Sequence, residues 1–424
     1  MNMNHFKKIV ATFAAVTALA QVANAICEVP GEQGSTQSTS QNIKSCMNMA
    51  NFLVEAPDLS NLESSQELIS PKVKNLNVTN GDSIYCRYNY QKQSGASAKF
   101  RCALTNEKNQ LFDSKGNLVP EAKTLKTVGD DVFLADEKGN IINEAKAKIL
   151  KVRYHNGDSR NVENYSSTAA SRILWALGVP AHTNIMTSKI TCFGCGSHPF
   201  KQTELEADRK NRYVVTEFKD ASIEVKFKGK RIYEPDQSPW GWTDLMNLSK
   251  SGAVDASTRI EIDVFALASQ FLGYMSDQNF QNAVVCTEVN KASPNICDKV
   301  VFMTHDIGAG LGKRYGKRGG LFGTSSRPRG DLKEFEAAQI FQPNTCSFMY
   351  QSGDSVPTTV SKEARDEFVR RAANLTEQNL IALYKASHIS NLTARNEAEA
   401  ANNDIRWAKA TMKKLEEIKN APCN

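Results

Sequence analysis

Beyond its first 25 residues the chain lacks any apolar run long enough to span a bilayer. Those first residues, MNMNHFKKIVATFAAVTALAQVANA, combine a short basic start, an apolar run and the small-x-small sequence Ala23-Asn24-Ala25. This pattern predicts a secretory signal peptide over residues 1–25. We therefore expect an exported protein without a transmembrane segment, located in the periplasm or outside the cell.

The chain also lacks a strong charge imbalance. It has 52 lysines and arginines against 46 aspartates and glutamates, a formal net charge of +6 at pH 7. An excess this small does not indicate nucleic-acid binding. The basic stretch GLGKRYGKRGGLFGTSSRPRG (310–330) is either a solvated loop or a segment that favours acidic or phosphorylated partners.

Two common catalytic and metal signatures are missing. No Gly-x-Ser-x-Gly sequence accompanies His198 or His305, so we expect both histidines to be structural. The sequence CFGCGSH offers Cys192, Cys195 and His198 as zinc ligands, but no second Cys-x-x-Cys completes the set. We prefer a disulfide between Cys192 and Cys195, and a thiol oxidoreductase built on this pair is an alternative.

The ten cysteines all follow Ala25 and are even in number, which predicts disulfides in an exported chain. Near neighbours give four pairs and elimination gives the fifth: Cys27/Cys46, Cys86/Cys102, Cys192/Cys195, Cys286/Cys297, and then Cys346/Cys423.

The order of elements predicts an α+β fold with two lobes. Residues 26–80 read as a Ser/Gln-rich N-terminal arm, and residues 81–235 as a β-rich N-lobe, an antiparallel sheet with one helix. Residues 236–424 read as a mostly helical C-lobe that contains a hairpin at 274–310. Within the N-lobe, LFDSKGNLVPEAK (111–123) and FLADEKGNIINEAK (133–146) form a repeat, each copy a hairpin with Lys-Gly-Asn at its turn.

The sequence KAKILKVRYHNGD contains the strongest predicted strand. Apolar residues alternate there with Lys151 and Arg153, so both cations share one face of the strand. The sequence VENYSSTAASRILWALGV that follows has helical periodicity and ends at Gly178. The strand YVVTEF (213–218) completes this part of the chain.

Three polar side chains are expected to meet beside a hairpin. Asn282 opens the run AVVCTEV, and KVVFMTHD (299–306) is its natural antiparallel partner, so Asn282 would face Asp306. Asp277, in the turn before this hairpin, would lie beside them. Carboxylate and amide oxygens suit Mg²⁺ or Mn²⁺ bound together with phosphate oxygens.

The order Asp277-x-x-x-x-Asn282, a hairpin, then Asp306-Ile307-Gly308 resembles the catalytic loop and metal-binding motif of the protein-kinase-like superfamily, which includes HipA-like and lipid-kinase-like members. Together with SRILWALG (171–178), it also resembles a group of exported bacterial proteins with SRxLWALG and DxxxxN…DxGA motifs. The resemblance spans roughly residues 145–390.

This resemblance implies roles for the candidate residues. Asp277 would orient the attacking hydroxyl and accept its proton, and Lys151 would pair with the transferred phosphate. Nucleotide contacts would come from Lys151, Arg153 and Glu217, and metal ligands from Asn282 and Asp306. The nucleotide would be ATP or a relative with Mg²⁺ or Mn²⁺, and the acceptor a hydroxyl of an unknown protein, lipid or glycan.

The sequence departs from the family pattern at several positions. Met275-Ser276 replaces the His-Arg that precedes the catalytic aspartate, and no Gly-x-Gly-x-x-Gly loop precedes Lys151. Ser166, Ser167 and Thr168 stand where the ion-pairing glutamate is expected, and Glu163 is the nearby acid. Two functions therefore stay open: an active kinase-like phosphotransferase, and a catalytically inactive pseudokinase or disulfide-stabilised interaction module.

Overall fold

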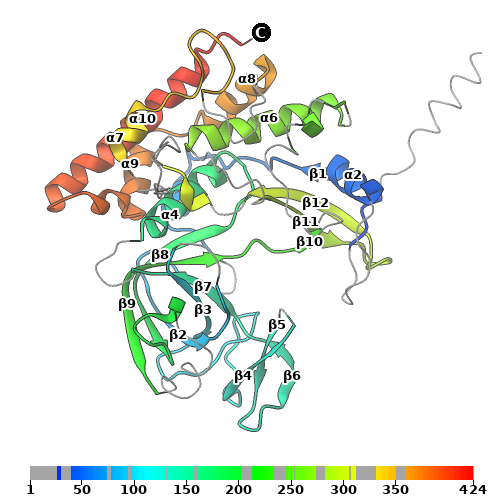
Figure 1. The fold of residues 1–424 in the computed structure, drawn as a ribbon, viewed down its shortest axis with the longest axis vertical. Helices are drawn as coiled ribbons and strands as arrows, with labels where there is room; N and C mark the ends of the chain where they lie inside the picture. The colour runs from blue at the N-terminus through cyan, green and yellow to red at the C-terminus, as the bar shows by residue number, and fades with distance from the viewer. Residues whose placement is uncertain are drawn as a thin grey trace, which may run out of the picture.

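The computed structural model describes residues 26–29, 40–73, 78–93, 97–129, 131–155, 161–201, 213–232, 245, 247–249, 251–252, 254–273, 282–304, 307–311, 331–349 and 359–423. The predicted signal peptide, residues 1–25, lies outside these ranges, as do Asp277 and Asp306. Over the described ranges, the chain forms a barrel, two further sheets and a group of helices (Figure 1). The predicted α+β class is confirmed.

Five strands close into a barrel in the order β2-β3-β7-β9-β8. Their bounds are β2 (Ser83–Asn89), β3 (Lys99–Thr105), β7 (Ile149–Arg153), β8 (Thr183–Phe193) and β9 (Val215–Val225). Alternate residues such as Phe100, Leu150 and Ile223 fill its interior. The predicted antiparallel sheet is therefore a closed barrel with one parallel pair, since β8 re-enters beside β2 in the same direction.

The second sheet is small and antiparallel, and it projects from the barrel at β3 (Figure 1). It consists of β4 (Thr124–Val128), β5 (Asp131–Ala135) and β6 (Ile141–Lys146). The second copy of the predicted repeat is the β5–β6 hairpin, and the first copy is a tight turn closed by a bridge between Phe112 and Leu118.

The turns of the two copies share one set of hydrogen bonds, and a third turn has the same set. In each, an Asp or Asn oxygen accepts the backbone N–H groups two and four residues later, at Asp113, Asp136 and Asn106. The repeat motif did not indicate the third copy, because Asn109 replaces the glycine there and adopts the same left-handed backbone, with φ of 60°.

The third sheet has the order β1-β12-β11-β10. Its strands are β1 (Ala50–Asn51), β10 (Lys230–Ile232), β11 (Asn282–Val289) and β12 (Cys297–Thr304). The antiparallel β11–β12 pair confirms the predicted hairpin, and the Cys286–Cys297 disulfide closes it. Because β10 follows β9 directly along the chain, this sheet is joined to the barrel.

The described helices pack mainly on the far side of this sheet from the barrel (Figure 1). Their bounds are α2 (Ser40–Met49), α3 (Leu62–Ile69), α4 (Val162–Ala176), α6 (Ala256–Phe271), α7 (Leu332–Ala337), α8 (Lys362–Ala372), α9 (Glu377–Ala386) and α10 (Glu397–Lys419). Three short 3₁₀ helices are η1 (Pro199–Lys201), η3 (Ile307–Ala309) and η4 (Ile389–Leu392). Within the described residues, no helix combines the length and apolar character needed to cross a membrane.

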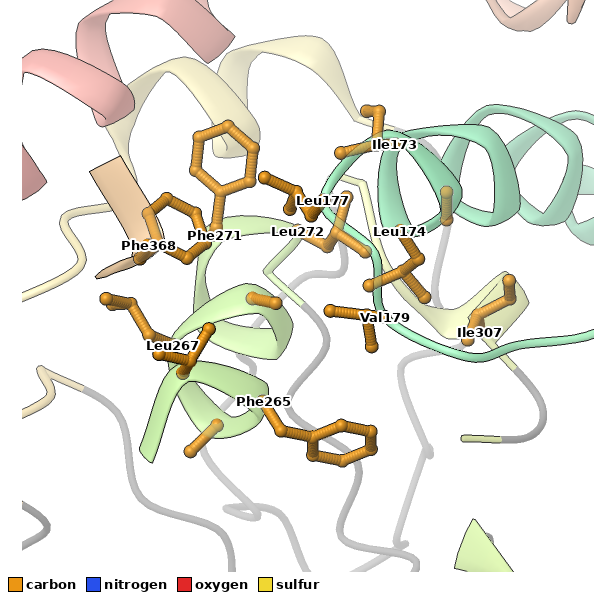
Figure 2. Close-up of a cluster of buried hydrophobic side chains, with 14 of the residues drawn as sticks. Ile173, Leu174, Leu177, Val179, Phe265, Leu267, Phe271, Leu272, Ile307 and Phe368 are labelled. Atoms are coloured by element: carbon orange, nitrogen blue, oxygen red, sulfur yellow. The ribbon is translucent and has the colours of Figure 1, made fainter. Parts of the chain in front are cut away.

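Helix α4 lies between the barrel and the other helices and is buried along almost its whole length. Asn161 caps its start by accepting the N–H of Glu163, and the chain leaves its end at Gly178, whose φ is +69°. Its apolar residues Ile173 and Leu174 meet those of α6 and η3 in one core (Figure 2). Helix α4 is therefore held simultaneously by the barrel, by the η3 segment and by the helical core.

The predicted N-terminal arm is integrated into the main core over the part that the structure describes. Phe52 stacks on Phe302 of β12 with ring centroids 4.8 Å apart, and β1 pairs in parallel with β12. Glu261 of α6 accepts the backbone N–H groups of Phe52 and Leu53 at 3.0 and 3.4 Å. The arm thus fastens the hairpin sheet to the helices.

All five predicted disulfides are confirmed: Cys27–Cys46, Cys86–Cys102, Cys192–Cys195, Cys286–Cys297 and Cys346–Cys423. Cys192 and Cys195 are fully buried in the barrel core. A zinc site is therefore not formed by this pair, and the burial removes the access that thiol exchange requires.

Candidate functional site

The outer face of the barrel carries a row of polar residues contributed by four strands. Leu150 and Val152 point into the barrel, so the intervening Lys151 lies on the outside, as the alternation predicted. Strand register places one residue of each neighbouring strand in the same row as Lys151: Arg101 of β3, Glu224 of β9 and Asn184 of β8. Arg153 lies two residues further along the same face.

Glu224 links the two cations of β7. Lys151 Nζ lies 3.1 and 3.0 Å from the two carboxylate oxygens of Glu224, and Arg153 Nη1 lies 2.7 Å from one of them. Arg153 is only 1% exposed and also contacts Asn184 Oδ1 at 3.3 Å. Burial alone would raise the pKa of Glu224, but Arg153 and Lys151 outweigh it and hold that pKa well below its usual range.

The pKa of Lys151 is lowered from its ordinary value, chiefly by burial and then by Arg153, against the opposing effect of Glu224. The face therefore holds two cations close together on one shared carboxylate. Lysine and arginine are the side chains that bind phosphate oxygens, and Lys151 is the more accessible of the two here.

Helix α4 contributes a second acid to the group. Glu163 Oε2 lies 3.6 Å from Arg153 Nε and accepts a hydrogen bond from Ser97 Oγ at 2.7 Å. The acid at the start of the helix therefore contacts Arg153 rather than Lys151. We refer to Lys151, Arg153, Glu163 and Glu224 as the four-residue ion cluster.

The segment directly after Asp306 packs on the same helix. Ser166 Oγ donates a hydrogen bond of 2.6 Å to the carbonyl of Gly308, and a Cβ added to Gly308 would lie 2.4 Å from Ser167 Oγ. Ser166 and Ser167 therefore allow η3 to approach α4 where a longer side chain would separate them. Ile307 and Gly308, next to Asp306 along the chain, thus contact the helix that carries Glu163.

Asn282 begins β11 and is almost completely buried. The predicted pairing of Asn282 with Asp306 is wrong, because the register places Thr304 opposite Asn282. The Asn282 Oδ1 atom accepts no hydrogen bond from any described residue. A buried acceptor without a donor is costly, and an amide oxygen suits a divalent cation, so this residue fits the predicted metal role.

The strand register also brings Asn282 toward the ion cluster. Thr304, its cross-strand partner, forms a bridge with Ala181, and Thr304 N–H donates to Pro180 O at 3.1 Å. Ala181 precedes Asn184 by three residues, about 10 Å of extended chain. Asn184 is in contact with Arg153.

Further polar residues near the ion cluster were not predicted from the sequence. His182 Nδ1 accepts the backbone N–H of Phe227 at 2.7 Å, and burial lowers the pKa of His182 to about 4, so it is neutral at pH 7. Burial, followed by Arg101 and Arg231, lowers the pKa of Lys226. The alternation along ASIEVKF could have indicated Glu224 and Lys226, since it places Lys226, just after the end of β9, on the same face as Glu224. It carries no signal for His182.

Glu217, predicted to contact the nucleotide, lies seven residues before Glu224 on β9. Its carboxylate forms a 2.7 Å ion pair with Lys189 and is about half exposed. It does not join the ion cluster. Asp277 and Asp306 lie outside the described residues, and within those residues no three His, Cys, Asp or Glu side chains gather as a metal site.

Comparisons with known proteins include a distant structural similarity. No family model and no curated protein matches the chain. Among solved structures, the chain is similar to the crystal structure of a Helicobacter pylori proinflammatory kinase, CtkA, at 9% sequence identity. The similarity covers 80% of this chain and 96% of that chain, with a TM-score of 0.41.

Proposed function

We propose that the protein has a kinase-like, two-lobed arrangement that binds a nucleotide with Mg²⁺ or Mn²⁺ and transfers phosphate to a hydroxyl group. The lobes would be the barrel and the helical part, with the β9–β10 connection between them. The observation that carries the proposal is the ion cluster, in which the buried Arg153 and the partly exposed Lys151 share Glu224.

The chemistry of the cluster supports phosphate binding. Phosphoryl transfer depends mainly on positioning and on stabilising negative charge, which fixed cations supply. Glu224 and Glu163 hold Arg153 in place, so it needs little reorganisation when an anion arrives. Lys151 is less buried than Arg153, with 22% of its side chain exposed, so it is the residue that would reach the phosphate.

The metal would be held on the other side of the phosphates. Asn282 supplies a buried amide oxygen, and Asp306 would supply a carboxylate directly before the segment that packs on α4. A bound divalent cation would neutralise charge on the phosphate oxygens. Asp277 would accept the proton of the attacking hydroxyl.

A second function, nucleotide binding without transfer, is favoured by the position of Glu163. This acid contacts Arg153 rather than Lys151, so Lys151 is held by Glu224 of the barrel and not by the helix. In this reading the disulfide-stabilised fold serves as an interaction module, and the nucleotide regulates it.

Thermal unfolding with ATP and Mn²⁺ tests the binding step. A nucleotide at about 100 times its Kd should stabilise the wild-type protein by about 2.7 kcal/mol. We expect Lys151→Met and Asp306→Ala to lose this stabilisation. Lys189→Met is the matched control, since Lys189 pairs with Glu217 on the same barrel but outside the ion cluster. If no nucleotide raises the melting temperature of the wild-type protein, the proposal is wrong.

An assay of phosphate transfer from ATP distinguishes the two proposed functions. Radiolabelled ATP would be incubated with the protein alone and with protein, phospholipid and glycan acceptors. Label incorporation that Asp277→Ala abolishes supports the phosphotransferase. Nucleotide binding without incorporation into any acceptor supports the second function.

A further inference from the structure

A cavity of about 520 Å³ lies at one end of the barrel, between β2, β3 and the turn that begins at Asp113. No residue of the ion cluster lines it, nor do Asn184, Asn282 or Glu217. Its volume falls within the range of about 300–1,000 Å³ that is typical of small-molecule sites.

The wall of the cavity is about half apolar and half polar. The apolar half is formed by Val73 and Val78 of the arm, Ile84 of β2, Leu104 of β3 and Phe112 beside the turn. These side chains also pack against the barrel core, so the wall is a continuation of that core. A wall of this mixed kind favours a ligand that has both an apolar body and a polar group.

Two polar groups of the lining have no partner within the described part of the chain. Thr105 is 3% exposed, yet its hydroxyl forms no hydrogen bond there. Lys115 is exposed at the rim, and no described acid lies within ion-pair distance of its ammonium group. Asn106 also lines the cavity, but its side-chain oxygen is occupied by the N–H groups of Lys108 and Gln110.

We propose that this cavity binds a small amphipathic carboxylate, with its apolar body against the wall and its carboxylate at Lys115. A single ammonium group matches the single charge of a carboxylate. The buried Thr105 hydroxyl would form a hydrogen bond to a polar atom of the ligand, which removes the cost of leaving it unpaired. This site is independent of nucleotide binding at the ion cluster.

Calorimetric titration of the full chain with decanoate tests the site, with decanol and decylamine as probes of equal chain length. We expect saturable binding of decanoate at one site and weaker binding of the alcohol and the amine. Lys115→Gln should weaken decanoate binding about tenfold, the effect of losing a charge-assisted contact of roughly 1.4 kcal/mol.

The internal repeat supplies the matched control. Lys138 occupies the position of Lys115 in the second copy, in a turn with the same hydrogen bonds, and it does not line the cavity. Lys138→Gln should leave decanoate binding unchanged. Thr105→Val keeps the shape of the side chain and should weaken binding a few-fold without lowering the melting temperature, since the hydroxyl it removes has no described partner.

Three results would overturn the proposal: no saturable binding of decanoate, equal loss of affinity in the Lys115→Gln and Lys138→Gln proteins, or decylamine binding as tightly as decanoate.

Discussion

At the scale of single residues, Glu224 balances the charge on the outer face of the barrel. It is almost fully buried and accepts hydrogen bonds from both Lys151 and Arg153. Without its charge, Lys151 would lose the carboxylate it is paired with, and Arg153 would keep its contact with Glu163. Removing one member of such a group lowers the stability of the folded protein by more than the whole group contributes to it, because the remaining charges stay buried without that partner.

We therefore predict that Glu224→Gln lowers the free energy of unfolding by about 3 kcal/mol, as measured by urea denaturation. Glu217→Gln is the control on the same strand, since Glu217 forms an exposed pair with Lys189. Its effect should be no more than about 1 kcal/mol. Equal effects of the two substitutions would mean that Glu224 in the buried ion cluster contributes no more to stability than Glu217 in its exposed ion pair.

Asp220 is the centre of a second polar group, on the bend of β9. Its carboxylate accepts hydrogen bonds from Tyr165 of α4 at 2.5 Å and from His388, before η4, at 2.7 Å. Burial would raise the pKa of Asp220, but the hydrogen bonds from His388 and Tyr165, together with the nearby His155 at 3.9 Å, outweigh it and hold that pKa well below its ordinary value of 3.8.

A carboxylate whose pKa is lower in the folded than in the unfolded protein stabilises the folded state when the pH is above its unfolded-state pKa. This stabilisation is lost as the pH falls from the unfolded-state pKa toward the folded-state pKa. We predict that the urea midpoint of the wild-type protein falls between about pH 5 and about pH 3. In the Asp220→Asn protein this fall should be smaller. Asp131→Asn, which removes a surface pair with Lys146, should keep the wild-type dependence; a flattened dependence there would argue against Asp220 as the cause.

Part of the candidate site could be predicted from local sequence and part could not. Alternation along β7 places Lys151 and Arg153 on one face, which a single strand is enough to show. Glu224 becomes their partner only through the register between β7 and β9, and these strands are far apart along the chain. Nothing local in the sequence encodes that register. Asp277 and Asp306 remain predictions.

At the scale of elements, the end of α4 is a crowded junction that explains the SRILWALG sequence. Arg172 donates to the carbonyls of Glu67 and Leu68 at the end of α3, and its guanidinium lies 4.4 Å from the Trp175 ring centroid. Gly178 then turns the chain. Its carbonyl accepts the N–H of Val54 at 2.7 Å, and so joins the arm to the helix.

We predict that Gly178→Ala is strongly destabilising. A Cβ there would lie 2.3 Å from Val54 O and 2.5 Å from the Arg371 guanidinium, in addition to the cost of a positive φ. Gly252→Ala is the matched control, because Gly252 has φ of +70° and no atom within 4 Å of the added Cβ. The control should cost about 1–2 kcal/mol in urea denaturation and Gly178→Ala clearly more. Similar losses of unfolding free energy in the two variants would show that the residues around Gly178 can move to accommodate the added methyl group.

Elements whose signals are local agreed with prediction, and those that depend on distant contacts did not. The β11–β12 hairpin followed from two apolar runs and a cysteine on each. The closed barrel could not be inferred, because it requires β2 and β8, which are far apart along the chain, to pair in parallel. The repeat indicated two turns, while the third differs at the glycine position.

At the scale of the whole molecule, the disulfides span very different lengths of chain. Cys346–Cys423 joins residues 77 apart, whereas Cys192–Cys195 joins residues 3 apart. The chain-entropy account assigns more stabilisation to the longer loop.

We predict that the Cys346→Ser/Cys423→Ser protein loses about 4 kcal/mol of unfolding free energy in urea, because its denatured state gains the freedom of a long loop. The Cys286→Ser/Cys297→Ser protein, whose loop spans 11 residues, is the comparison and should lose less. The reverse order would indicate that native-state packing, rather than loop length, sets the effect.

The arm also fixes the order in which the molecule can be completed. Phe52 and Val54 leave the ribosome early, yet the surfaces that receive them are β12, the end of α4 and Arg371, the last of which is synthesised more than three hundred residues later. The side chain of Phe52 therefore stays exposed to solvent until nearly the whole polypeptide has been synthesised and the arm can pack against these surfaces. Docking of the arm is consequently a late step, and we expect a truncated nascent chain to bind holding chaperones through the exposed segment.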